Sequence, residues 1–456
     1  MHAPVTSDTR HRLLVDLYEL TMVDAYRREG MDQRPATFSL FVRDLPAGRG
    51  FLVAAGLDDA LAWLEELHFA DGDLAALAGL AAFDPGFLDW LAGLRFTGDV
   101  RAVPEGTVVF AHQPILEVDA PIGEAQLAET FLLNQVTLQT TLATKAARCR
   151  HAAAGRAVVD FALRRTQGVD AGMKLARCGA LVGLSATSNV AGAARYGLPA
   201  SGTMGHAFVQ AHADETDAFR AFARAYGEAA VLLVDTYDSH RGIERAITVA
   251  RELKADGTEI RGIRLDSGDL AELSAHARRR LDEAGLPYVQ ILASGGLDEH
   301  AVHRLVEQGA PIDGFGLGSA LGVSADAPTL DSVYKLVAFD GRPVMKTSAA
   351  KAIWPGAKQL WRAPDWSSDV LALAGEAAPG PGFEPQLVEV MHQGRRTPAG
   401  RRSVVDARHH FEQQWAELPD PLRRLQDPPA RNLQVSVALA RTAEELRTRH
   451  HVEEAP

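Results

Sequence analysis

Cysteine is scarce in this sequence, with only Cys149 and Cys178 among 456 residues. The two form no CxxC motif and have no paired histidines around them, so the sequence supports neither a disulfide framework nor a zinc cluster. Long apolar stretches are also missing. No run reaches 18 apolar residues, and no basic segment followed by an apolar one opens the chain. We therefore expect a cytoplasmic protein with no membrane partner.

Positive charge is in deficit as well, because 47 Lys and Arg residues face 59 Asp and Glu residues, a formal net charge of −12. A nucleic-acid-binding surface needs a field that attracts phosphate, so we expect no nucleic-acid partner. A small anionic ligand is still compatible with this charge, since a local group of cations and backbone N–H groups is enough to hold one. Arg164, Arg165 and Arg264 could supply those cations.

Hydrophobic residues make up 46% of the chain, which is enough for large cores and predicts two or three domains. Residues 1–125 mix helix-period and strand-like segments and predict a mixed α/β domain. Residues 126–335 begin with a long helical pattern and then alternate between strand-like and helix-period segments, which predicts an α/β barrel. Residues 336–456 predict a return segment that packs on the N-terminal domain, followed by a helical C-terminal extension.

Seven short apolar runs carry the barrel prediction. They recur every 20 to 30 residues between about residue 157 and residue 320, and each ends in polar or glycine residues. The runs are AVVDFAL, ALVGLS, LPASGTMGH, AVLLVDTYDSH, GIRLDSGD, VQILASGG and IDGFGLGS. Strands and helices in steady alternation form βαβ units, and the active site of a parallel barrel lies in the loops after its strands. The fold class predicted here is α/β, an irregular parallel α/β barrel beside a mixed α/β domain, and the protein is predicted to be an enzyme.

Glycine turns after the last two runs are candidate phosphate sites. SGG spans Ser294, Gly295 and Gly296, and GLGS ends in Gly318 and Ser319. Glycines let the backbone approach a phosphate, and the N–H groups at the start of the following helix supply donors. Either motif alone could be a structural turn, but two in consecutive loops favour phosphate binding.

The remaining candidates are charged or titratable residues that follow other strands. Arg264 could grip a carboxylate, and Asp266 could bind ribose hydroxyls or a hydrated Mg²⁺. Asp269 could instead cap the next helix. His206 and Asp235 end neighbouring runs, so an aspartate that orients the histidine, as general base or as nucleophile, is geometrically reasonable.

With these residues in view, the chain resembles the nicotinate phosphoribosyltransferases, type II phosphoribosyltransferases that begin NAD salvage. The likeness covers about 350 residues with several long motifs in the expected order. The motifs are DLYELTMVDAY, RGFLVAAGLDDAL, LNQVTLQTTLATKAAR, SGTMGHAFVQ, GIRLDSGDL, ASGGLDE, GSALGVSADAPTLDSVYKLV and KAIWPGAKQLWR.

The resemblance implies a reaction and its substrates. Nicotinate and phosphoribosyl pyrophosphate would give nicotinate mononucleotide and pyrophosphate, with ATP hydrolysis coupled to the transfer and Mg²⁺ required. The histidine of the family's GTxxH motif, phosphorylated by ATP, is His206 in this chain, and Asp235 matches the acidic residue that orients it. Gly205 departs from the alanine common in the family, which adds backbone freedom and leaves the histidine in place.

The resemblance also implies substrate contacts. Thr203 and Arg264 would bind the nicotinate carboxylate, and Phe161 would stack on the pyridine ring with Arg164 or Arg165 nearby. Tyr18 is similar to the aromatic residue that a neighbouring subunit adds to the other ring face, which implies a homodimer with shared active sites. Asp266 would face the ribose. The 5-phosphate would be held by Gly295, Gly296, Gly318 and Ser319, with Ser294 in the same turn.

Three alternatives remain open at this point. A nicotinamide phosphoribosyltransferase of the same fold should place an acidic residue near the ATSN loop, where this chain has Thr187, Ser188 and Asn189. A quinolinate phosphoribosyltransferase should have a denser cluster of cations in a shorter chain. The third alternative is an inactive barrel that binds phosphorylated metabolites. Four residues present together argue against it, namely His206, Asp235, Arg264 and Asp266.

Overall fold

A computed structural model describes residues 12–80, 82–347 and 353–453. The motif KAIWPGAKQLWR begins with two residues, 351 and 352, that lie outside the described residues. The chain divides into two compact units. The terminal unit holds the described residues up to Thr144 and those from Thr329 onward, and the central unit holds Lys145–Pro328.

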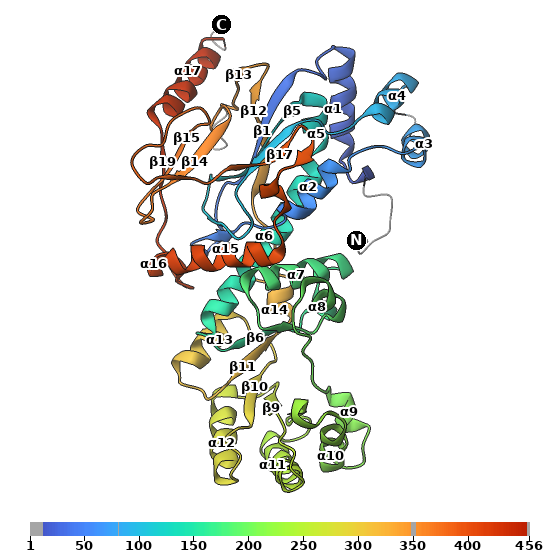
Figure 1. Cartoon of the computed structure of the whole chain (residues 1–456), viewed down its shortest axis with the longest axis vertical. Helices are drawn as coiled ribbons and strands as arrows, with labels where there is room; N and C mark the ends of the chain where they lie inside the picture. The colour runs from blue at the N-terminus through green and yellow to red at the C-terminus, as the bar shows by residue number, and fades with distance from the viewer. Residues whose placement is uncertain (1–11, 81, 348–352, 454–456) are drawn as a thin grey trace. The chain divides into compact units, whose positions relative to one another are not determined.

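An antiparallel sheet is the framework of the terminal unit (Figure 1). The chain returns to this sheet after the central unit, because the strand 332–339 pairs with 35–42 and the strand 388–392 pairs with 99–102. In spatial order the strands are β13 (Arg342–Pro343), β12 (Ser332–Phe339), β1 (Pro35–Val42), β5 (Pro114–Pro121), β3 (Asp99–Ala102), β17 (Val388–His392) and β18 (Arg395–Arg396).

Two smaller sheets and a set of helices complete the terminal unit. One small sheet pairs β16 (Glu384–Pro385), β14 (Lys358–Arg362), β15 (Asp369–Leu373) and β19 (Leu433–Val435), and the other pairs β2 (Leu52–Val53) with β4 (Val108–Val109). The helices are α1 (Leu17–Arg28), α2 (Leu57–Glu65), α3 (Asp71–Gly79), α4 (Pro85–Gly93), α5 (Ile122–Leu127), the first part of α6 (Glu129–Ala152), α15 (Val404–Glu417), α16 (Asp420–Arg423) and α17 (Val437–Glu453).

The core of the terminal unit lies between the large sheet and its helices. In β1 every residue after Pro35 is buried, including the polar Thr37 and Ser39. The rings of Phe38 and Tyr334 stack across β1 and β12 at 4.8 Å. Helix α1 turns Leu20 and Val23 into the same core. Burial of this apolar area is the main force that holds the unit together.

A curled parallel sheet is the framework of the central unit. Its strands run in the order β7 (Ala186–Thr187), β6 (Ala157–Asp160), β11 (Gly314–Leu317), β10 (Gln290–Ala293), β9 (Gly262–Leu265) and β8 (Val231–Leu233). The helices between them are α7 (Val169–Val182), α8 (Val190–Tyr196), α9 (His206–Gln210), α10 (Glu215–Tyr226), α11 (Ser239–Ala255), α12 (Leu270–Glu283), α13 (Glu299–Glu307) and α14 (Ser319–Gly322). The predicted α/β class with a parallel barrel-like sheet is confirmed, as a half-barrel with β7 and β8 at its edges.

A buried ion network fixes α13 behind the sheet. Glu299, the first residue of α13, pairs with Lys145, and Arg148 Nε lies 2.9 Å from its other carboxylate oxygen. Lys145 Nζ also lies 2.7 Å from Asp326 Oδ1. Removing one partner from such a buried network leaves an uncompensated charge, so the network holds the start of α13 in one position.

Two of the seven predicted barrel strands are wrong. In ALVGLS, the residues Ala180–Val182 are the last turn of α7, which ends at Gly183 with φ +76°. A short apolar run does not distinguish a buried strand from a buried helix, and the strand begins only at Ala186. LPASGTMGH forms one parallel bridge, Thr187 to Ala200, because proline and two glycines interrupt it.

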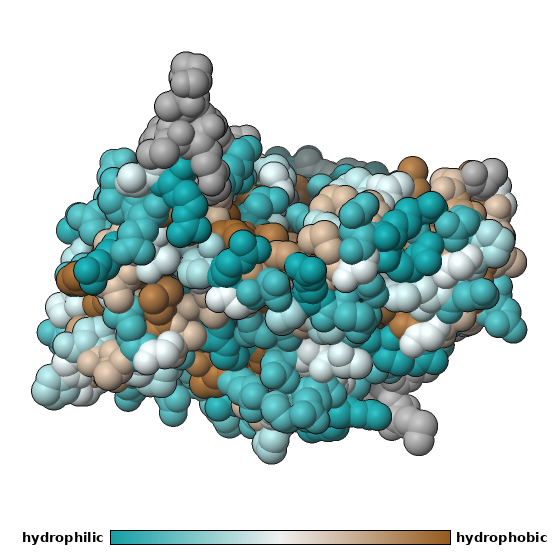
Figure 2. Space-filling model, turned by 90° about the horizontal axis from the view of Figure 1, so that it is seen from above, coloured by the Kyte–Doolittle hydropathy of each residue, from teal (hydrophilic) through white to brown (hydrophobic). Residues whose placement is uncertain are grey.

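The face of the molecule shown in Figure 2 is mostly polar. In Figure 2, hydrophilic residues cover most of the face shown, and apolar residues form small separate groups between them. Among the helices that the structure describes, none combines the length and the hydropathy that a membrane span requires.

Candidate active site

Six parallel strands bring the candidate residues of the central unit to one edge. Parallel strands share a direction, so residues that follow their carboxyl ends gather on one side of the sheet. The residues that directly follow strands at this edge are Phe161 after β6, Ser188 after β7, Asp266 after β9, Ser294 after β10 and Gly318 after β11, and Asp235 follows β8 by one residue. The loop 201–205 then leads into α9 at His206.

Asp266 connects three of these loops. One of its carboxylate oxygens accepts a hydrogen bond from the Ser294 hydroxyl, and the other lies 3.9 Å from His206 Nε2. Its backbone N–H donates to Asp235 Oδ2 over 3.2 Å. The single residue that follows β9 therefore contacts the residues after β8 and β10 and the start of α9. The neighbouring Asp269 caps α12, accepting hydrogen bonds from the N–H groups of Ala271 and Glu272.

His206 presents a partly exposed imidazole at the start of α9. Its side chain is 42% exposed, and Nδ1 hydrogen-bonds the Thr236 hydroxyl at 3.2 Å. Thr236 and Asp266 are thus the side chains that contact the ring. Asp235 has other partners: its Oδ2 accepts hydrogen bonds from the Asp266 N–H and from the Ser267 hydroxyl. Direct orientation of His206 by Asp235 stays a prediction.

Arg264 and Phe161 form a cation beside an aromatic face. The guanidinium carbon lies 5.9 Å from the Phe161 ring centre, and Nη2 donates to the Met204 carbonyl over 3.1 Å. Burial lowers the pKa of the Arg264 guanidinium, and nearby Arg164 adds to that effect. Among the described residues, Arg264 Nε is buried with no hydrogen-bond partner. A buried cation with an unsatisfied donor favours an anionic ligand.

Gly316 makes room for the Phe161 ring. A Cβ atom at position 316 would lie 2.4 Å from a carbon of that ring, closer than any packing allows. Gly316 lies within β11, where glycine normally weakens a strand, and a close neighbour explains its presence. The role of Gly316 was not expected from the sequence, although it belongs to the GLGS motif.

The residues expected to bind nicotinate do not all lie close to Arg264. Thr203 donates to the same Met204 carbonyl that Arg264 contacts, so these two side chains converge. Arg164 and Arg165 are exposed on the short helix after Phe161. Tyr18 belongs to α1 of the terminal unit, where burial and the adjacent Glu129 raise the pKa of its phenol. Its contribution to the site stays a prediction.

The glycine turn after β10 packs directly on Asp266. Gly295 has φ +92°, and a Cβ atom there would lie 1.7 Å from the Asp266 carbonyl oxygen. Only glycine fits this position. Gly296 has φ +65°, and no atom lies within 4 Å of where its Cβ would be. Gly318 likewise has open space in front of it, and the next residue, Ser319, is exposed.

Asp160 and Thr187 hold the ends of β6 and β7 together. Thr187 Oγ1 donates to Asp160 Oδ2 over 2.7 Å, and Ala162 N–H donates to Oδ1 over 2.8 Å. Burial raises the pKa of the Asp160 carboxyl. Asn189 caps α8, and its amide also donates to the Gly172 carbonyl. Thr187 and Asn189 therefore serve the structure of the loop, and Ser188 lies between them, half-buried.

Two carboxylates at this edge suit a magnesium ion. Among the described residues, Asp235 Oδ1 is buried with no hydrogen-bond partner, and Asp235 Oδ2 accepts the Asp266 backbone N–H, so the two aspartates are neighbours. Mg²⁺ prefers oxygen ligands and usually takes one or two carboxylates together with substrate phosphates. The donor set present at Asp235 and Asp266 fits that requirement.

Comparisons with known proteins agree over most of the chain. The nicotinate phosphoribosyltransferase N-terminal domain model matches residues 13–137, and the nicotinate phosphoribosyltransferase family model matches residues 157–353. A nicotinate phosphoribosyltransferase of Mycobacterium tuberculosis is 50% identical over 91% of this chain and 89% of its own. One of Bacillus subtilis is 43% identical over 77% of this chain and 72% of its own. The crystal structure of human nicotinic acid phosphoribosyltransferase superposes with a TM-score of 0.84 at 30% identity, over 94% of this chain and 99% of that one.

Proposed function

The chain belongs to the nicotinate phosphoribosyltransferase family and is an enzyme of NAD salvage, and we propose that ATP drives its transfer reaction through a phosphohistidine at His206. The overall reaction joins nicotinate to phosphoribosyl pyrophosphate and releases nicotinate mononucleotide and pyrophosphate. The observation that carries the proposal is the contact of Asp266 with both His206 and Ser294. It links the predicted phosphorylation site to the predicted sugar-phosphate site.

In this proposal Arg264 binds the nicotinate carboxylate. Its buried Nε would gain a partner, and a charge-assisted bond of this kind is about twice as strong as a neutral one. Thr203 would add a hydroxyl from the same side. The pyridine ring would stack on Phe161, whose face already lies beside the guanidinium, with Arg164 or Arg165 at its exposed edge.

Nicotinate rather than nicotinamide is the substrate favoured by the ATSN loop. The amide of nicotinamide needs an acceptor for its N–H groups. An enzyme that uses nicotinamide is expected to provide that acceptor as an acidic residue near this loop. Ser188 stands there, while the nearby Asp160 carboxylate is engaged by Thr187 and by a backbone N–H. The cation at Arg264 suits a carboxylate better than an amide.

The sugar phosphate would lie across the loops after β9, β10 and β11. Asp266 would accept hydrogen bonds from the ribose hydroxyls, and the 5-phosphate would rest on backbone N–H groups where glycines leave open space. The residues proposed for the phosphate are Ser294, Gly295, Gly296, Gly318 and Ser319. Departure of pyrophosphate leaves positive charge on the ribose, which fixed carboxylates stabilise.

Asp235 and Asp266 would hold Mg²⁺ beside the pyrophosphate. When bound, the ion neutralises negative charge that develops on the leaving pyrophosphate. The protein orients Asp235 through the Asp266 N–H, which donates to its Oδ2, and orients the Asp266 carboxylate through the Ser294 hydroxyl.

His206 would act as the nucleophile toward ATP. A ring nitrogen forms a bond to the γ-phosphorus while the bond from that phosphorus to the ADP oxygen breaks, and hydrolysis later releases phosphate. Thr236 holds Nδ1 and Asp266 lies near Nε2, so both sides of the ring have a polar neighbour that limits its rotation. The ring is exposed enough for ATP to reach it.

A homodimer with shared active sites completes the proposal. Tyr18 is 45% exposed on α1, an unusual position for a large aromatic residue that serves only a core. In the proposed dimer its ring covers the second face of nicotinate bound to the neighbouring subunit.

Labelling with γ-phosphate-labelled ATP tests the phosphohistidine. The wild-type enzyme should acquire acid-labile label, and His206→Ala should not. His212→Ala is the matched control, because His212 lies just beyond the same helix and bonds only the Phe208 carbonyl among its described contacts. Label that persists in His206→Ala, or that disappears in His212→Ala alone, would remove His206 from this role. A parallel assay of nicotinate, nicotinamide and quinolinate, with and without ATP, separates the three substrates.

A further inference from the structure

The terminal unit contains a cavity of about 600 Å³ at one end of its large sheet. Cavities of this size accept small organic molecules. The walls include residues of β1, β3, β5, β12, β13 and β15 and of the segment before β14, all within one unit. Apolar wall residues include Phe339, Pro343 and Leu373. None of the residues that line this cavity belongs to the central-unit loops that carry the transferase residues.

Two carboxylates face the cavity from directly opposite positions. Asp99 on β3 pairs in register with Asp119 on β5, and Thr37 on β1 pairs with Asp119 in turn. All three line the cavity. Like charges directly opposite each other on neighbouring strands destabilise a sheet. Such an arrangement points to a positively charged group that reduces the repulsion.

The protein compensates these charges only in part. Arg101 Nη2 lies 3.4 Å from Asp119 but 2.8 Å from Glu117, which also pairs with Lys358 at 2.9 Å. The Thr37 hydroxyl donates to Asp119. Burial raises the pKa of the Asp119 carboxyl, which agrees with incomplete compensation. The described residues that line the cavity include no lysine, arginine or histidine.

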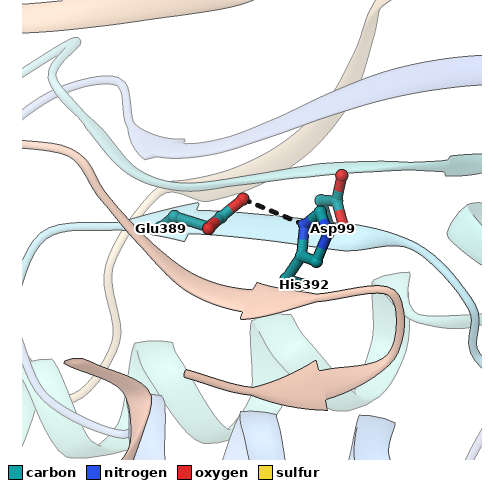
Figure 3. Close-up of side chains that lie close together, drawn as sticks. All are labelled: Asp99, Glu389 and His392. Atoms are coloured by element: carbon teal, nitrogen blue, oxygen red, sulfur yellow. Dashed lines mark hydrogen bonds and ion pairs between the residues drawn. The ribbon is translucent and has the colours of Figure 1, made fainter. Parts of the chain in front are cut away.

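Asp99 has a second set of neighbours outside the cavity. Figure 3 shows the His392 ring between the carboxyl groups of Asp99 and Glu389, with Nδ1 3.2 Å from an oxygen of each. The three ligand atoms lie within 4.8 Å of one another, a spacing that could also hold a metal ion. Glu389 and His392 are half-exposed and do not line the cavity, whereas Asp119 lines it and is not in this group. A metal site would therefore depend on Glu389, whereas a ligand site in the cavity would depend on Asp119.

We propose that the cavity binds a small organic cation, namely a primary ammonium group on a compact apolar body. The ammonium group would lie between Asp99 and Asp119, where its three donors can reach both carboxylates and the Thr37 hydroxyl. The apolar body would rest against Phe339, Pro343 and Leu373. A neutral molecule of the same shape would gain the apolar contacts but not the relief of carboxylate repulsion.

Three probes of similar shape and different charge test this proposal. Benzylamine, benzyl alcohol and benzoate are titrated into the full-length enzyme at neutral pH, and binding is measured by calorimetry and by ligand-observed NMR. Benzylamine should bind at least about tenfold more tightly than benzyl alcohol, as a charge-assisted contact implies. Benzoate should bind more weakly than either. Equal binding of amine and alcohol, or no binding of the amine, would overturn the proposal.

Two isosteric variants locate the site. Asp119→Asn should weaken benzylamine binding at least about tenfold, and Glu389→Gln should leave it unchanged. A zinc titration is run on the same proteins. Tight zinc binding that depends on Glu389, with no amine binding, would show a metal site and overturn the proposal. If Asp119→Asn does not fold, Asp99→Asn replaces it, since its amide oxygen can still accept the Gln393 N–H bond at 2.7 Å.

Discussion

At the scale of single residues, Arg264 gives the clearest prediction about substrate binding. Its guanidinium is held by the Met204 carbonyl and the Phe161 face, and its Nε has no partner among the described residues. A free side chain on the surface would gain little by binding a carboxylate, because water already satisfies it. Arg264 gains more, because its side chain is half-buried and its Nε is shielded from water.

Arg264→Ala should therefore raise the KM for nicotinate well over tenfold, since a hydrogen bond to a charged group contributes roughly 1.5 to 3 kcal/mol. Steady-state kinetics at saturating phosphoribosyl pyrophosphate measure the change. Arg261→Ala is the control, because Arg261 is exposed just before the same strand. An unchanged KM in Arg264→Ala would exclude this residue from the nicotinate site.

Other residue roles were visible only in part from the sequence. The charged side chains were found because they follow predicted parallel strands, where the active site of such a sheet lies. Thr236 and Gly316 were missed, although each belongs to a motif that had been noticed. A threonine hydroxyl and a missing side chain gain meaning only from what lies opposite them, here His206 and the Phe161 ring.

At the scale of elements, the turn after β10 is the most constrained part of the site. Gly295 combines a left-handed backbone with direct contact on the Asp266 carbonyl, while Gly296 has a similar backbone and free space. An alanine at Gly296 would therefore introduce backbone strain alone, whereas an alanine at Gly295 would introduce both backbone strain and a steric clash.

Gly295→Ala should lower the free energy of unfolding by at least about 1 kcal/mol more than Gly296→Ala, because only the first substitution adds a clash to the strain. Urea denaturation of both variants measures this difference. The KM for phosphoribosyl pyrophosphate should also rise more in Gly295→Ala, since the clash displaces Asp266. Equal effects on stability in the two variants would contradict the packing described for this turn.

Elements were predicted well where the apolar run was short and bounded by turns. The strands β8, β9, β10 and β11 lie in the runs expected for them. The prediction failed at ALVGLS, where the buried end of α7 looks like a strand. Periodicity needs several turns to identify a helix, and a three-residue apolar run does not provide them.

At the scale of the whole molecule, Tyr18 belongs to the terminal unit, whereas the loops that would bind nicotinate belong to the central unit. A chain whose site needs a residue from another subunit can be tested by mixing defective subunits. Each homodimer then lacks one essential group in both sites, whereas a mixed dimer has one intact site.

Tyr18→Ala and His206→Ala should each lose activity, and their mixture after reversible dissociation should recover roughly a quarter of the wild-type turnover, as random pairing of two-fold dimers requires. The transferase assay with ATP present measures the recovery. Mixing either variant with itself is the control. No recovery from mixtures that sedimentation shows to be dimeric would place Tyr18 outside a shared site.

The sequence alone determined the α/β class, the strand-end positions of the reactive residues and, through its motifs, the family. Those features depend on local periodicity and on residue types, both of which can be read in one dimension. Tertiary structure decided which groups lie together: Asp266 near His206, Gly316 against the Phe161 ring, and two carboxylates opposite each other at the cavity. Contacts between residues far apart in the chain depend on strand order and register, which local patterns do not specify.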